Sequence, residues 1–90
     1  MANLRNFKKD VTYLVEEVIS DCWAFMYFNP EKNAGDCNDI INDAIDFRDE
    51  MFTKINHPEK DNVKGYYKGL NRELLEKIDA LFERISQLNK

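Results

Sequence analysis

The sequence predicts an all-α fold, a three-helix antiparallel bundle with up-down-up topology, formed by residues 1–90 as a single domain. Apolar residues recur at steps of three and four through three long segments, which is the spacing of one helical face. Two breaks that contain proline, Asn29-Pro30 and Asn56-His57-Pro58, separate these segments, because the residue before proline is disfavoured in the α region. No useful length of sequence alternates apolar and polar residues, so strands are not expected.

The first predicted helix runs from about Asn3, a plausible N-cap, to Phe28. Its core stripe contains Leu4, Phe7, Val11, Leu14, Val18, Cys22 and Phe25. The run Cys22-Trp-Ala-Phe-Met-Tyr-Phe28 at its end is apolar or aromatic on every side. Because one neighbouring surface cannot cover such a helix, this end is either enclosed from several directions or left in part for another molecule.

A loop is predicted from Asn29 to Gly35, followed by a second helix from about Asp36 to Asn56, with Asp36 as its cap. One face of this helix is apolar: Cys37, Ile40, Ile41, Ala44, Ile45, Phe47, Met51, Phe52 and Ile55. The opposite face is acidic: Asp36, Asp39, Asp43, Asp46 and Glu50. This clean division predicts an amphipathic helix with one buried side.

The third predicted helix runs from about Asn62 to Leu88, after a short connection that makes it an antiparallel neighbour of the second. Its stripe contains Val63, Tyr67, Leu70, Leu74, Ile78, Leu81, Ile85 and Leu88. Gly65 and Gly69 weaken its start by up to about 1 kcal/mol each relative to alanine. Two interpretations therefore stay open: a continuous helix from Asn62, or regular helix only from near Asn71.

Composition and charge favour a cytoplasmic protein that does not enter a membrane. The longest apolar run is much shorter than the roughly 20 residues of a membrane span, and the N-terminus lacks the apolar stretch of a secretory signal. The net charge is −4, with acidic groups concentrated between residues 29 and 61 and a basic excess after residue 62. The two cysteines, Cys22 and Cys37, are predicted to be free thiols at different heights along the bundle.

Arg48 is the oddest single residue, because it lies on the apolar face of the second helix. Folding the first two helices about their loop places it level with Glu17, so a buried interhelical ion pair with a snorkelling arginine stem is predicted. The alternatives are a pair between subunits, or a bundle that binds a small ligand or anion, or acts as an enzyme, through Arg48 and nearby carboxylates.

Other chemistry is weakly supported by the sequence. No catalytic motif is present, no cofactor is predicted, and the function leans away from catalysis. No Glu-x-x-His pair exists, and the only histidine, His57, falls in a predicted turn, so no metal is expected. The stretch Lys64-Gly-Tyr-Tyr-Lys-Gly69 interleaves basic and aromatic residues, but the acidic total argues against a nucleic-acid partner.

The best candidate interface is the aromatic set Trp23, Tyr27 and Phe28. Either the end of the third helix, with Phe82, Ile85 and Leu88, covers Trp23 and Phe28 within one chain, or the aromatic set serves self-association or another protein. The favoured function is a non-catalytic protein-interaction or self-assembly module, in which a homodimer would form a larger helical bundle. A third hypothesis is that the acidic face binds a basic protein.

The passage from Ile55-Asn-His-Pro58 to Asp61-Asn-Val-Lys-Gly-Tyr-Tyr-Lys68 is similar to one in small uncharacterised helical proteins of gut and oral bacteria. The resemblance covers residues from about Asn29 to the end. It implies an all-helical bundle, carries no known activity, and transfers no site.

Overall fold

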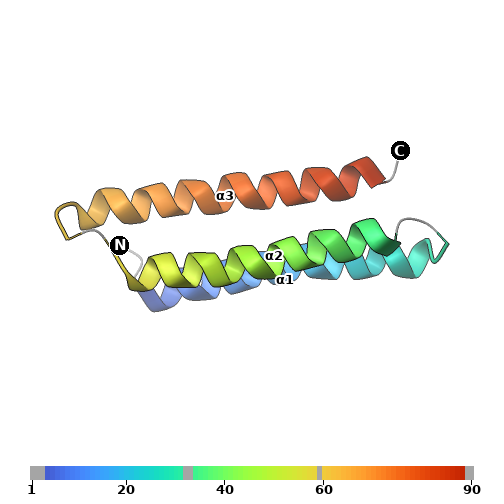
Figure 1. The fold of residues 1–90 in the computed structure, drawn as a ribbon, viewed down its shortest axis with the longest axis horizontal. Helices are drawn as coiled ribbons and strands as arrows, with labels where there is room; N and C mark the ends of the chain where they lie inside the picture. Colours follow the sequence, from blue (N-terminus) through green and yellow to red (C-terminus); the bar gives the residue numbers. More distant parts are fainter. Residues whose placement is uncertain (1–3, 32–33, 59, 89–90) are drawn as a thin grey trace.

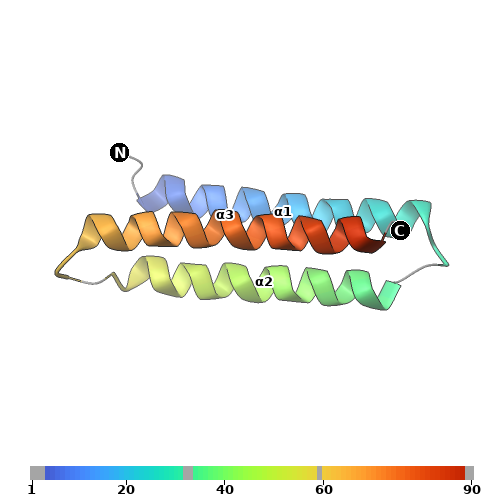
Figure 2. The same cartoon turned by 90° about the horizontal axis from the view of Figure 1, so that it is seen from above.

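Three long helices make up the computed structural model, which describes residues 4–31, 34–58 and 60–88. They are α1 (Leu4–Phe28), α2 (Ala34–Asn56) and α3 (Val63–Leu88). The helices lie side by side in a rod of 51 × 20 × 19 Å (Figure 1). α1 and α3 run in the same direction and α2 runs in the opposite one (Figure 2). The predicted three-helix up-down-up bundle is confirmed, and the described residues contain no strand.

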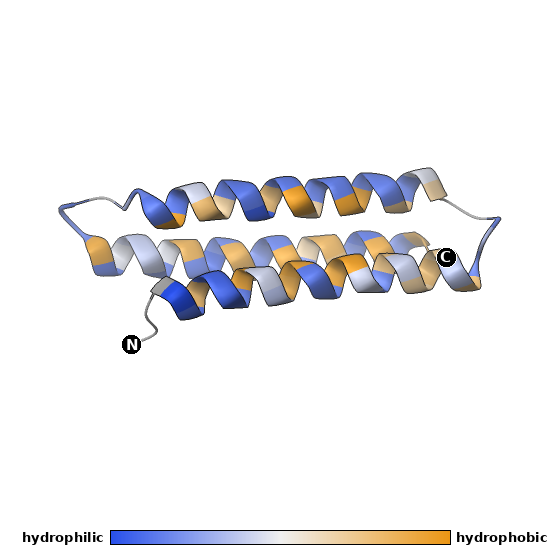
Figure 3. Ribbon diagram, turned by 90° about the horizontal axis from the view of Figure 1, so that it is seen from below, coloured by the Kyte–Doolittle hydropathy of each residue, from blue (hydrophilic) through white to orange (hydrophobic). Residues whose placement is uncertain are grey.

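The core is built from apolar side chains that recur at steps of three and four along each helix, because this spacing keeps them on one side. Figure 3 shows the apolar segments of α2 on the side that faces the other two helices. Among the described residues, no polar or charged side chain is buried. The buried residues are Phe7, Val11, Val15, Val18, Cys22 and Phe25 in α1, Cys37, Ile40, Ala44, Phe47, Met51 and Ile55 in α2, and Leu70, Leu74, Ile78, Leu81 and Ile85 in α3.

The end of α1 is closed by Asn29. Its backbone N–H and its side-chain Nδ2 both donate to the carbonyl oxygen of Phe25, at 2.9 and 3.0 Å. The backbone bond is the last one with α-helical i to i−4 spacing, and the side-chain amide gives the same carbonyl a second donor. Pro30 follows directly and has no N–H to continue the helix. The predicted N-cap of this helix, Asn3, lies outside the described residues.

α2 begins at Ala34, two residues earlier than predicted, so the loop predicted from Asn29 to Gly35 is shorter. Asp36 therefore does not cap the helix but lies in its first turn. A carboxylate in the first turn is stabilised by the partial positive charge of the helix N-terminus. Asp36 thus correctly indicated that a helix starts in this region, but the predicted start lies half a turn too late in the sequence.

α3 is continuous from Val63, so the alternative start near Asn71 is wrong. Asn62 acts as its N-cap, since its Oδ1 accepts a hydrogen bond from the backbone N–H of Gly65 at 3.1 Å. A Cβ atom at position 65 would collide with the Asn62 side chain. Gly65 therefore leaves room for the cap, which offsets the low helix propensity of glycine.

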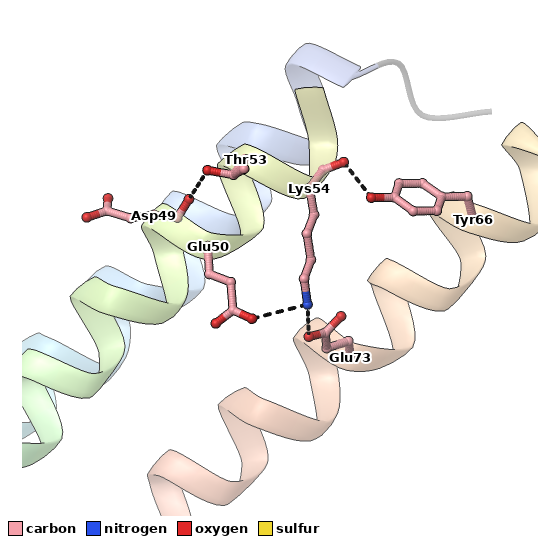
Figure 4. A network of polar contacts seen from close by, with 6 residues as sticks. All are labelled: Asp49, Glu50, Thr53, Lys54, Tyr66 and Glu73. Carbon is pink, nitrogen blue, oxygen red and sulfur yellow. Dashed lines mark hydrogen bonds and ion pairs between the residues drawn. The ribbon is translucent and has the colours of Figure 1, made fainter. Parts of the chain in front are cut away.

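Two tyrosines of α3 close the C-terminal end of α2. The Tyr66 hydroxyl donates to the carbonyl oxygen of Lys54 at 2.8 Å (Figure 4). The Tyr67 hydroxyl donates to the carbonyl oxygen of Ile55 at 2.9 Å. Beside them, Lys54 Nζ lies 2.7 Å from a carboxylate oxygen of Glu73 in α3. The Tyr67 ring also packs edge-on against Phe7 of α1, with centroids 6.4 Å apart. This end of the bundle is thereby held together by all three helices.

Candidate functional site

The run from Cys22 to Phe28 divides between the inside and the outside of the bundle. Cys22 and Phe25 are buried, whereas Trp23, Tyr27 and Phe28 are 63%, 80% and 76% exposed. Trp23, Tyr27 and Phe28 are referred to below as the aromatic surface. Coverage of Trp23 and Phe28 by the end of α3 was one predicted outcome, and it is wrong.

The reason is the side on which α3 packs. Phe82 and Leu88 are partly buried against the core, on the same side of α1 as Cys22 and Phe25. Positions one residue later along α1 are rotated by about 100° around the helix, which turns Trp23 away from the core. Tyr27 and Phe28 pack against each other instead, edge to face, with centroids 5.2 Å apart and planes at 89°.

A further exposed ring, Tyr13, was missed in the sequence, and it extends the aromatic surface along α1. Tyr13 belongs to a repeat of residues that are 4, 3, 4, 3 and 4 positions apart. All members of this repeat are exposed and lie on the side of α1 opposite the core. The members of this outer stripe are Lys9, Tyr13, Glu16, Ser20, Trp23 and Tyr27. The signal in the sequence was this second heptad-like spacing, which the stronger apolar repeat obscures.

The N-terminal half of the same face carries a shallow, open hollow. It is lined by Arg5, Lys8, Lys9, Thr12, Tyr13 and Glu16. Three of these six residues are basic, so the hollow presents positive charge next to exposed aliphatic stems. The outer face of α1 is therefore basic in its first half and aromatic in its second.

The predicted buried pair of Arg48 and Glu17 is wrong. The Arg48 side chain is 35% exposed and its Nη2 contacts Asp49 Oδ1 at 3.3 Å, while Glu17 is exposed on α1. Since the core stripe of α2 passes through Ala44, Phe47 and Met51, position 48 lies at its margin. From there the long arginine stem reaches water, and the charge needs no buried partner. Arg48 does not line the hollow on α1 or the one between α2 and α3 described next, so these hollows lend no support to a ligand site built on it.

The acidic residues of α2 are all exposed. Besides Asp49, which contacts Arg48, two of them have basic partners. Asp43 Oδ2 accepts from Arg84 Nη1 at 2.6 Å, and Glu50 lies 3.2 Å from Lys54 Nζ. These surface pairs contribute at most about 1 kcal/mol each.

A shallow hollow between α2 and α3 is lined by Asp43, Asp46, Phe47, Glu50, Glu73 and Lys77. Among the described residues, no group of three or more His, Cys, Asp or Glu side chains is arranged to hold a metal ion.

Both cysteines are free and buried, which confirms the prediction of free thiols. Burial, with smaller contributions from Cys37 and Asp21, raises the pKa of the Cys22 thiol to about 11, against a lowering effect of Arg84. Burial also raises the pKa of the Cys37 thiol. The nucleophilic thiolate form is therefore disfavoured at both positions.

We expect both thiols to react slowly in the folded protein. At pH 8, the shift at Cys22 lowers the thiolate fraction by about 100-fold, so labelling by an aromatic disulfide should be slower by at least that factor than in denaturant. The same pKa shift makes the stability of the fold depend on pH. Because the pKa of Cys22 is higher in the folded protein than the unfolded value of 9.0, its neutral thiol contributes its full stabilisation of the fold below pH 9, and this contribution is lost as the pH rises toward 11. The free energy of unfolding should fall over this range, and less so in Cys22→Ala. Fast labelling of the native protein would show that the thiols are accessible.

Comparison of the chain with protein-family models, with curated proteins and with solved structures found no match. None of the described helices combines the length and the apolar character needed to cross a membrane. The fold and its surface chemistry are therefore the basis for inferring function.

Proposed function

We propose that this protein is a non-catalytic self-assembly module that associates with a second copy of itself through the aromatic surface on α1. The observation that carries the proposal is the exposure of Trp23, Tyr27 and Phe28, three large rings near the end of α1 on a bundle whose core is formed by other side chains. Burying one such side chain contributes about 1.5–3 kcal/mol. Aromatic residues of this kind dominate the binding energy of protein interfaces.

The shape of the surface favours a protein partner. Small-molecule sites are concave and enclose most of their ligand, whereas these rings project from the outside of a helix. A second copy is the simplest partner, because two-fold dimers are the commonest soluble assemblies and use the same patch on both subunits. The proposal includes a cytoplasmic location, where the buried thiols Cys22 and Cys37 would stay reduced.

The test is the molar mass in solution, measured by light scattering and sedimentation equilibrium over a wide range of protein concentration. The mass should rise from the 10.7 kDa of one chain toward twice that value. The double variant Trp23→Ser/Tyr27→Ser should remain at the mass of one chain and keep its helical circular dichroism. A matched control, Leu75→Ser, removes an exposed apolar side chain of α3 and should associate like the wild type. A wild-type chain that stays monomeric at every concentration would refute the proposal.

A further inference from the structure

We propose that the two copies pair through their α1 helices in antiparallel orientation, about a two-fold axis that crosses the outer face of α1 at the level of residue 18. In this arrangement Lys9 of each copy faces Tyr27 of the other, and Tyr13 faces Trp23. The inference rests on the proposed function and adds to it the orientation and the residue contacts of the interface.

The first argument is the spacing of the outer stripe. Steps that alternate between four and three residues form a straight seam along an α-helix, which is the pattern that two packed helices share. From Lys9 to Tyr27 the seam runs about 27 Å at 1.5 Å per residue. Every member is exposed in the single chain. The core stripe lies on the opposite side of α1, so α2 and α3 do not obstruct a helix that approaches this seam.

The second argument is that the stripe is symmetric about position 18. Lys9 and Tyr27 are equally distant from this position, as are Tyr13 and Trp23, and also Glu16 and Ser20. A two-fold axis perpendicular to the helix places each residue opposite the one at equal distance on the other side. All six members of the stripe are thus matched with another member. In a two-stranded antiparallel coiled coil, the two kinds of seam position face each other in this way.

The third argument is the chemistry of the matched residues. The Lys9 ammonium group meets the face of the Tyr27 ring, which attracts cations. Tyr13 and Trp23 form an aromatic pair, and the Ser20 hydroxyl can donate to the Glu16 carboxylate. The aromatic half of one copy also lies over the basic hollow of the other. Parallel pairing would instead oppose Lys9 to Lys9 and Glu16 to Glu16, and like charges in contact oppose association.

The orientation is tested by disulfide cross-linking of introduced cysteines under mild oxidation, with the buried Cys22 and Cys37 left in place. Asp10 and Ala24 are exposed and flank the seam on the same side. Antiparallel pairing brings residue 10 of one copy beside residue 24 of the other, whereas two residues at position 10 lie about 24 Å apart along the axis. A mixture of Asp10→Cys and Ala24→Cys chains should therefore cross-link much faster than either variant alone.

The contacts are tested by the dissociation constant. Lys9→Gln should raise it by about tenfold or more, because the lost contact occurs twice in the dimer. Lys68→Gln, an exposed lysine of α3, is the matched control and should leave it unchanged. The pairing also brings the two Glu17 carboxylates together at one edge of the seam, so Glu17→Gln should tighten the association.

The outcomes separate the two proposals. Dimers in which Asp10→Cys cross-links with itself, and in which Lys9→Gln has no effect, would overturn the antiparallel pairing and leave self-assembly standing. A wild-type chain that is monomeric at every concentration would overturn both. Circular dichroism of each variant checks that the bundle remains folded.

Discussion

Replacing Leu74 by alanine is expected to lower the free energy of unfolding by about 2–5 kcal/mol. Leu74 lies in the middle of α3 and is 1% exposed, among the buried residues of all three helices. Truncation removes apolar surface that folding had taken from water and leaves a cavity that the surrounding side chains fill only in part. Since small domains are stable by only about 5–15 kcal/mol, this single change should remove a large share of the total.

The adjacent residue supplies the control. Leu75 has the same side chain on the same helix but is 50% exposed, so Leu75→Ala should change the free energy of unfolding by less than about 1 kcal/mol. Urea denaturation followed by circular dichroism measures both, and the dependence on urea should keep its slope if the folded and unfolded states stay equally compact. Equal losses for the two variants would mean that the buried side of α3 has been identified wrongly.

The fold could be predicted because its signals are local. Steps of three and four mark the buried side of each helix, and the two proline-containing breaks mark the ends. The end of α1 at Phe28 and the end of α2 at Asn56 were predicted to the residue. The start of α2 was less accurate, because both Ala34 and Asp36 suit a first turn and propensity alone does not separate them.

Contacts between helices were harder to predict, because they depend on how the faces meet. The hydroxyls of Tyr66 and Tyr67 bond to carbonyl groups twelve residues earlier in the chain, and nothing in the spacing of α2 or α3 indicates this. Arg48 was placed in the core because its neighbours on the helix are apolar. A stem of several methylene groups at the margin of a core stripe can satisfy both the apolar neighbours and the charge.

The candidate interface was predicted in part. The residues Trp23, Tyr27 and Phe28 could be named from the sequence, because a helix end that is apolar all round needs more than one cover. Whether α3 would cover them could not be decided, since that depends on which side of α1 it packs. Tyr13 was missed because a single tyrosine among charged residues is usually an ordinary surface residue, and only the outer stripe as a whole gives it a role.

The second large effect is expected from adding volume to the core at Ala44. This residue is fully buried in α2, so the leucine in Ala44→Leu has to displace neighbouring side chains or spread the helices, which typically costs about 1–3 kcal/mol. For a domain of this size the melting temperature should fall by roughly 5–20 °C, measured by circular dichroism at one fixed protein concentration so that association does not shift the result.

The matched control is Ala80→Leu, which makes the same change at an exposed position of α3. Leucine and alanine differ little in helix propensity, so this variant should melt within a few degrees of the wild type. If the melting temperature of Ala44→Leu were as high as that of Ala80→Leu, the space between the helices at position 44 would have to be wider than a close-packed bundle allows.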